Sequence, residues 1–140
     1  MIGIVICGHG QFASGIYSSI QLIAGEQEHM KAIDFKEGMN VSQLKNELGL
    51  AIAEVEQGDG VVVFTDIPGG TPFNQSVILS IERKNVKVIS GVNLPSLLDG
   101  MFSRELGLDQ FVTQAIRAGE DGLQHYQSKE KQKVEREDGI

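Results

Sequence analysis

The chain alternates short apolar runs with longer segments in which apolar residues recur every three or four positions. Short continuous apolar runs are typical of strands buried on both faces of a parallel sheet. Spacing of three to four residues is typical of helices with one buried face. The pattern predicts four strands, each followed by a helix: Ile2 to Cys7, Met30 to Phe35, Val61 to Phe64 and Val86 to Ile89.

This alternation predicts an α/β fold with a doubly wound, mostly parallel open sheet and helices on both faces. Ser42 is the expected N-cap of the second helix. Thr71 is the expected N-cap of the third, with Pro72 at the first helical position. A last helix is expected from about Asp109 to Gly119.

Length and charge narrow the function classes. The 140 residues predict one domain over residues 1–122, followed by a polar, charged C-terminal segment over 123–140. A net charge of −7 disfavours nucleic acid as a partner, because such binding depends on Lys and Arg.

Cys7 is the only cysteine, so no intrachain disulfide can form. Without a signal-peptide pattern or a run long enough to span a bilayer, we expect a cytoplasmic protein.

The strongest candidate for chemistry is His9, which lies between two glycines where the first strand gives way to a helix. Open parallel sheets place their ligand sites at the carboxyl ends of the strands, where the strand order reverses. Asp66 follows the third strand, so the two side chains are expected at the same edge. Asp66 would accept a hydrogen bond from His9 Nδ1 and leave Nε2 as a nucleophile.

A phosphoryl group on that nitrogen would need hydrogen-bond donors, which backbone amides at a helix start supply. The candidate phosphoryl-binding residues therefore lie in the glycine-rich turn and the first turn of the third helix: Gly69, Gly70, Thr71, Phe73 and Asn74. Each of them also has a purely structural interpretation, as a turn or helix-capping residue. The functional interpretation depends on their convergence with His9 and Asp66.

Other site patterns fail specific tests. The glycine at position 15 comes too late for a dinucleotide-binding fingerprint, and the chain has no P-loop and no nucleophile elbow.

Two alternative functions stay open from the residues alone. One is a phosphomonoesterase similar to the histidine phosphatases, which the absence of an arginine before His9 disfavours. The other is a non-catalytic regulatory or binding module on the same fold.

With these residues in view, the chain resembles the enzyme IIA component of the mannose-type (mannose/fructose/sorbose) phosphoenolpyruvate:sugar phosphotransferase system. The resemblance covers Met1 to about Gly122. The matching pieces, in order, are Ile4-Val5-Ile6 with Gly8-His9-Gly10, Gly25-Glu26-Gln27, Ile33-Asp34-Phe35, Asp66 with Gly69 to Asn74, and Ser90 to Pro95.

The resemblance implies a phosphotransferase that works without metal or other cofactor. The histidine matching His9 would be phosphorylated on Nε2 by the phosphocarrier HPr, and the aspartate matching Asp66 would orient it. The phosphoryl group would pass to a IIB component and then to a sugar entering through a membrane permease. The resemblance also implies a homodimer with an exchanged, antiparallel C-terminal edge strand. Because no linker to a IIB domain follows, we expect a stand-alone IIA.

Overall fold

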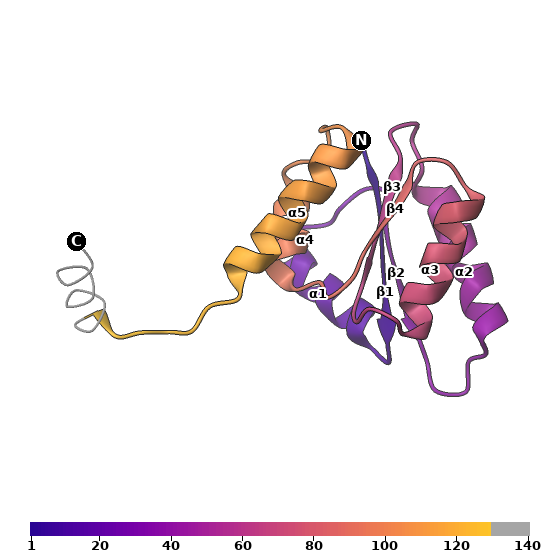
Figure 1. Cartoon of the computed structure of the whole chain (residues 1–140), viewed down its shortest axis with the longest axis horizontal. Coiled ribbons are helices and arrows are strands. Elements are labelled where there is room, and N and C mark those ends of the chain that lie inside the picture. The colour runs from indigo at the N-terminus through magenta and orange to yellow at the C-terminus, as the bar shows by residue number, and fades with distance from the viewer. Residues whose placement is uncertain (130–140) are drawn as a thin grey trace.

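The structure, a computed structural model, describes residues 1–129 and consists of a central sheet between two layers of helices (Figure 1). All four strands in this range are parallel and lie in the order β2-β1-β3-β4. The strands are β1 (Gly3–His9), β2 (Met30–Phe35), β3 (Val61–Thr65) and β4 (Val86–Ile89). The predicted doubly wound α/β fold is therefore confirmed.

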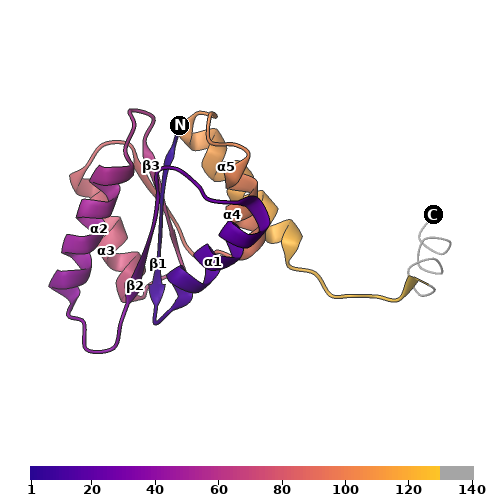
Figure 2. The same ribbon diagram turned by 180° about the vertical axis from the view of Figure 1, so that it is seen from behind.

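Helices cover both faces of the sheet. Figure 2 shows α1 (Phe12–Ala24), α4 (Leu94–Met101) and α5 (Leu108–Gly122) on one side, and α2 (Val41–Val55) with α3 (Thr71–Glu82) on the other. No helix within residues 1–129 is long and apolar enough to span a bilayer. Beyond α5 the chain runs away from the body of the domain up to residue 129. Most of the charged C-terminal segment, residues 130–140, lies outside the described residues.

Alternation along β1 divides the core into two clusters. Ile4 and Ile6 are fully buried in the cluster beneath α1, α4 and α5. Val5 and Cys7 are equally buried in the cluster beneath α2 and α3. Each fully buried aliphatic side chain contributes about 1.5–3 kcal/mol relative to exposure. Burial also raises the pKa of the Cys7 thiol to about 12, with further contributions from nearby carboxylates, so the thiol stays protonated and unreactive.

Two predicted helix starts are wrong by one or two residues. Asn40, not Ser42, caps α2, because Gln43 lies three residues later and completes a reciprocal capping box with Asn40. At α3 the N-cap is Gly70, not Thr71, and no side chain caps that helix.

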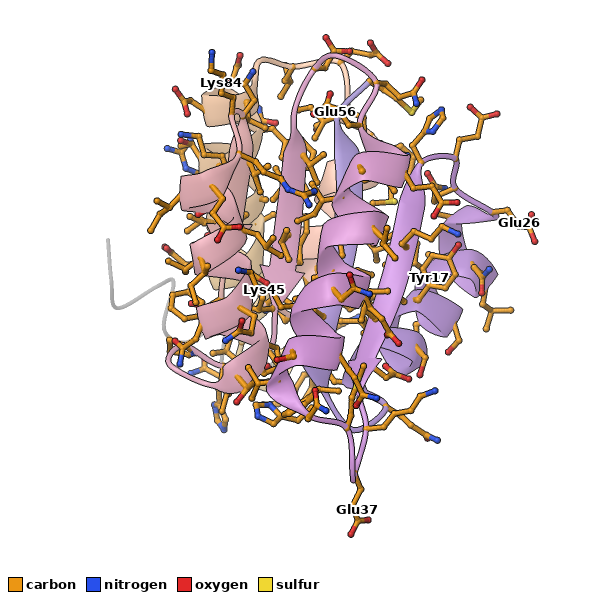
Figure 3. All side chains as sticks on the ribbon, turned by 90° about the vertical axis from the view of Figure 1, so that its right-hand side faces the viewer. Tyr17, Glu26, Glu37, Lys45, Glu56 and Lys84 are labelled. Carbon is orange, nitrogen blue, oxygen red and sulfur yellow. The ribbon has the colours of Figure 1, made fainter. Side chains whose placement is uncertain are left out.

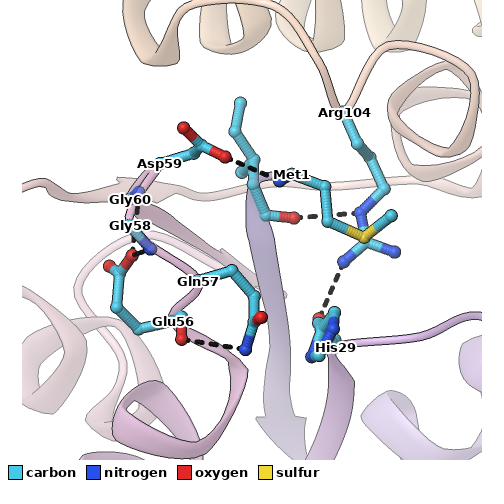
Figure 4. Close-up of polar contacts among 9 residues, drawn as sticks. Met1, His29, Glu56, Gln57, Gly58, Asp59, Gly60 and Arg104 are labelled. Atoms are coloured by element: carbon cyan, nitrogen blue, oxygen red, sulfur yellow. Dashed lines mark hydrogen bonds and ion pairs between the residues drawn. The ribbon is translucent and has the colours of Figure 1, made fainter.

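At the amino ends of the strands, one buried side chain holds the sheet to the connection between α4 and α5. Arg104, 5% exposed, donates from Nε to the Ile2 carbonyl at 2.9 Å (Figure 4). Its Nη1 and Nη2 donate to the carbonyls of Glu28 and His29 at 2.5 and 2.8 Å. His29 adopts φ 52°, and its carbonyl also accepts from the Ile4 amide. The backbone carbonyls of Ile2, Glu28 and His29 at this end of the sheet therefore all accept hydrogen bonds from Arg104.

We predict that Arg104→Met lowers the free energy of unfolding by about 2–4 kcal/mol, because one buried and two partly buried hydrogen bonds from a charged donor to backbone carbonyls are lost. Urea unfolding measures the change. Arg117→Met is the matched control, since Arg117 is exposed on α5 and its replacement should shift stability by less than about 0.5 kcal/mol. Equal effects of the two substitutions would contradict this role of Arg104.

Candidate functional site

The candidate site lies at the carboxyl ends of the strands, opposite Arg104. In the order β2-β1-β3-β4, the direction of winding reverses between β1 and β3. His9 is the last residue of β1, and Asp66 directly follows the last residue of β3. The topology therefore brings these two predicted site residues together at the switch point, where doubly wound sheets bind ligands.

The alternation of β1 also sets the direction of His9. Val5 and Cys7 face α2 and α3, and His9 continues this series on the same side of the sheet. Its ring thus lies beside the N-terminus of α3: a Cβ built on Gly70 would lie 2.8 Å from His9 Cε1. The alternation of side chains along β1 therefore directs the imidazole of His9 toward the start of α3.

Asp66 holds both the ring and the backbone of His9. One carboxylate oxygen, Oδ2, accepts from His9 Nδ1 and from the His9 backbone amide, each at 2.8 Å. The other oxygen accepts from the Ile67 amide, also at 2.8 Å. Burial would raise the pKa of the Asp66 carboxyl, but hydrogen bonds from His9 and Ile67 outweigh burial and hold that pKa below its usual 3.8. Asp66 is therefore a carboxylate at neutral pH.

This contact fixes the tautomer of the neutral ring. A carboxylate only accepts hydrogen bonds, so His9 Nδ1 must carry the proton and Nε2 must present its lone pair. Within residues 1–129, no hydrogen bond engages Nε2. The His9 side chain is 46% exposed while that of Asp66 is only 12% exposed. The pair thus consists of an accessible nucleophile supported by a covered carboxylate.

The first turn of α3 lies beside Nε2. The peptide N–H groups of a first helical turn lack intrahelical partners and favour an anion. Thr71 and Phe73 contribute amides of this kind, while Pro72 between them has none. Of the predicted residues, Gly70 lies against the His9 ring, and the others adjoin it in the turn and at the start of α3: Gly69, Thr71, Phe73 and Asn74.

Asn74 departs from the expected role. Its backbone amide donates to the Gly70 carbonyl at 2.8 Å, as part of the helix, and its side-chain amide donates to the Gly69 carbonyl at 3.0 Å. The prediction of a free Asn74 backbone donor is therefore wrong. Asn74 instead fixes the glycine-rich turn to the helix.

Sequence reasoning missed the contribution of β2 to the site. Phe35 is the register partner of His9, and the two rings meet edge to face with centroids 5.9 Å apart. The Phe35 carbonyl accepts from the Gly10 amide at 2.9 Å, where Gly10 turns the chain with φ 58°. Asp34 accepts from the Ser14 amide and hydroxyl, at 2.9 and 2.6 Å, and so holds the start of α1.

The loop between β2 and α2 stands at the same edge of the sheet. Figure 3 shows Glu37 at its tip, pointing away from the domain beyond the strand ends. The other two histidines lie elsewhere: His29 immediately precedes β2 at the amino edge, and His125 is exposed beyond α5. Residues 1–129 contain no group of three or more His, Cys, Asp or Glu residues arranged to hold a metal ion.

Fold and site together define an α/β protein with a histidine–carboxylate pair at the switch point of its sheet. A family model described as "PTS system fructose IIA component" (EIIA-man) matches residues 3–116. The fructose-specific EIIA component of the Bacillus subtilis phosphotransferase system is 32% identical over 105 residues, covering 75% of this chain and 72% of that protein. The chain therefore belongs to the mannose-type EIIA family of the phosphotransferase system.

Two further relatives extend the comparison. The mannose-specific EIIAB component of Escherichia coli K12 is 31% identical over 135 residues, which cover 95% of this chain. The chain spans only 42% of the length of that relative. The crystal structure of an EIIA component from Streptococcus agalactiae, 37% identical, superposes with a TM-score of 0.83 and covers 89% of this chain and 97% of its own.

We predict that Asp66→Asn abolishes the tautomer preference of His9. A side-chain amide can donate to Nδ1 as readily as accept from it, so the neutral ring should shift about tenfold or more toward the form protonated on Nε2. Nitrogen-15 NMR of the His9 ring measures the two forms.

Asp34→Asn is the matched control for this change. Asp34 is the penultimate residue of the neighbouring strand β2 but bonds Ser14, not His9. An unchanged ring spectrum in Asp66→Asn, or the same shift in both variants, would contradict the orienting role of Asp66.

Proposed function

We propose that this chain is a phosphoryl carrier in sugar uptake, which accepts a phosphoryl group on His9 Nε2 from phospho-HPr and passes it to a IIB component. The observation that carries the proposal is the 2.8 Å contact between His9 Nδ1 and Asp66, which leaves Nε2 unengaged beside the first turn of α3. Family membership supports the reaction class. The carrier would act in the cytoplasm and reach the membrane permease only through IIB.

The transfer is a displacement at phosphorus between two nitrogens. Nε2 of His9 attacks in line with the phosphorus–nitrogen bond of the donor phosphohistidine. A new bond to Nε2 forms, the old bond breaks, and its electron pair returns to the donor ring. The proton on Nδ1 stays in place, so the positive charge that develops on the His9 ring lies 2.8 Å from Asp66. This position matches that of the orienting carboxylate in a hydrolase triad.

The start of α3 supplies the remaining stabilisation. Charge in phosphoryl transfer spreads over three equatorial oxygens, and preorganised donors at those oxygens lower the barrier. The Thr71 and Phe73 amides at the positive end of the helix dipole, with the Thr71 hydroxyl, are the proposed donors. Neutral donors of this kind hold the phosphoryl group without trapping it, which suits a carrier that must also release it.

We predict that incubation with phosphoenolpyruvate, enzyme I and HPr adds one acid-labile phosphoryl group to the chain, and that His9→Ala abolishes the addition. Intact-mass spectrometry measures it. His29→Ala and His125→Ala should gain the group normally, since neither histidine lies at the site. Asp66→Asn should slow the gain by about 10²-fold or more, because the wrong tautomer is populated.

The mass measurement, together with a phosphatase assay, separates the two alternatives from a carrier. A phosphomonoesterase would release inorganic phosphate from a small phosphate ester, and His9→Ala would abolish that release. A regulatory or binding module would gain no mass and would tolerate His9→Ala in its partner assay. Either result would overturn the carrier assignment.

We further propose that the chain forms a homodimer through the open edge of β4. In the order β2-β1-β3-β4, β4 has a neighbour on one side only among residues 1–129, and the backbone groups on its other side can accept another strand. A hollow of about 300 Å³ borders this edge and includes Ile116 and Leu123, which are 42% and 85% exposed. The segment that leaves α5 could pair there as an exchanged strand.

Sedimentation or light scattering of the full chain should give twice the monomer mass of 15.2 kDa. Leu123→Asp should shift the population toward monomer, because it places a charge in the apolar contact. Leu22→Asp is the control, since Leu22 is 89% exposed on α1, away from β4. A monomeric wild type would reject the dimer and leave the carrier assignment standing.

A further inference from the structure

Gly70 occupies a backbone position that does not require glycine. It is the N-cap of α3, with φ −78° and ψ 169°. The N-caps of α2 and α4, Asn40 and Asn93, adopt φ −86° and −129° with ψ 164° and 174°. All three lie in the extended region that any residue adopts and that N-caps favour. The conformational freedom of glycine is not used here.

Helix capping also favours a different residue at this position. Asn40 and Asn93 each form a reciprocal capping box, with side-chain oxygens that accept the backbone amide three residues later. Asn, Asp and Ser are the best N-caps, and glycine is weaker. The helix α3 begins with no side-chain cap. Side-chain caps are also missing at α1 and α5. At the other glycine N-cap, Gly107 of α5, an added Cβ would meet nothing within 4 Å, so Gly70 differs from it in what surrounds the missing side chain.

The ring of His9 fills the space that a side chain at residue 70 would occupy. A Cβ built on Gly70 would lie 2.8 Å from His9 Cε1 and 3.4 Å from Nε2. The ring is held on its other sides, by Asp66 at Nδ1 and by the edge contact with Phe35. Making room for a Cβ would displace the ring from this position and so weaken one of these contacts.

We propose that Gly70 is a positioning residue whose missing side chain does two things for phosphoryl transfer. It seats the His9 ring against the start of α3, and it leaves the Phe73 amide, the one a capping side chain would accept, free for an oxygen of the phosphoryl group. This inference rests on the carrier function proposed above and adds to it the reason that α3 starts uncapped. Gly70 acts here through its absent side chain, whereas its amide was the feature first predicted for the site.

Two substitutions test the two effects. Gly70→Ala adds the Cβ without a cap, and Gly70→Ser adds the same Cβ with a hydroxyl that can accept the Phe73 amide. Both should fold, because the backbone conformation suits them, and urea unfolding should place Gly70→Ser at or above Gly70→Ala in stability. Both should weaken the Nδ1-protonated tautomer of His9 in nitrogen-15 spectra. Both should slow phosphoryl uptake from phospho-HPr on the order of 10²-fold, Gly70→Ser the more.

Gly15→Ala is the matched control. Gly15 lies on the exposed face of α1, where a Cβ would meet nothing within 4 Å, so the same chemical change should leave uptake and the His9 spectrum at wild-type values. Uptake within about twofold of wild type in both Gly70 variants, or failure of both to fold, would overturn the inference. A wild type that takes up no phosphoryl would overturn the carrier function instead, while the ring spectra would still test the position of His9.

Discussion

The site depends on one carboxylate oxygen of Asp66 that bonds the same histidine twice. It accepts the backbone amide and the ring Nδ1 of His9, each at 2.8 Å, so the end of β1 and the imidazole are fixed to the end of β3 together. Such charge-assisted bonds are about twice as strong as neutral ones. The contact exists only because β1 and β3 are parallel neighbours whose ends coincide. The pairing of β1 with β3 therefore determines which ring nitrogen of His9 carries the proton.

The two ends of the sheet differ in how their polar groups are hydrogen-bonded. At the amino edge, Arg104 satisfies three backbone carbonyls from a buried position. At the carboxyl edge, the start of α3 has no side-chain cap, and His9 Nε2 has no partner among the described residues. Unpaired groups destabilise a fold when they are buried, but exposed ones cost little and remain available to a ligand. The amino edge therefore stabilises the domain, and the carboxyl edge is left open for chemistry.

The strands and the meeting of His9 with Asp66 followed from the sequence, because buried parallel strands are continuous apolar runs and their ends share one edge. The contact between Phe35 and His9 did not, since it requires knowing that β2 lies beside β1 and in which register. The cap of α2 was misplaced because Ser42 and Asn40 are both good caps, and only Gln43 distinguishes them. At α3 capping propensity favours Thr71, which has the better capping side chain, but the helix has its N-cap one residue earlier, at Gly70, where the His9 ring occupies the side-chain space.

The energies at Gly70 explain how such an exception persists. Replacing a good capping residue by glycine costs only a few tenths of a kcal/mol. Domains of this kind have about 5–15 kcal/mol of stability, so the fold tolerates the missing cap of α3, as it does those of α1 and α5. A side chain at the same place would force the His9 ring off Asp66 or Phe35. The loss of one charge-assisted hydrogen bond, about 1.5–3 kcal/mol, exceeds the gain from any cap. Hence the glycine is favoured by the site although the helix would prefer another residue.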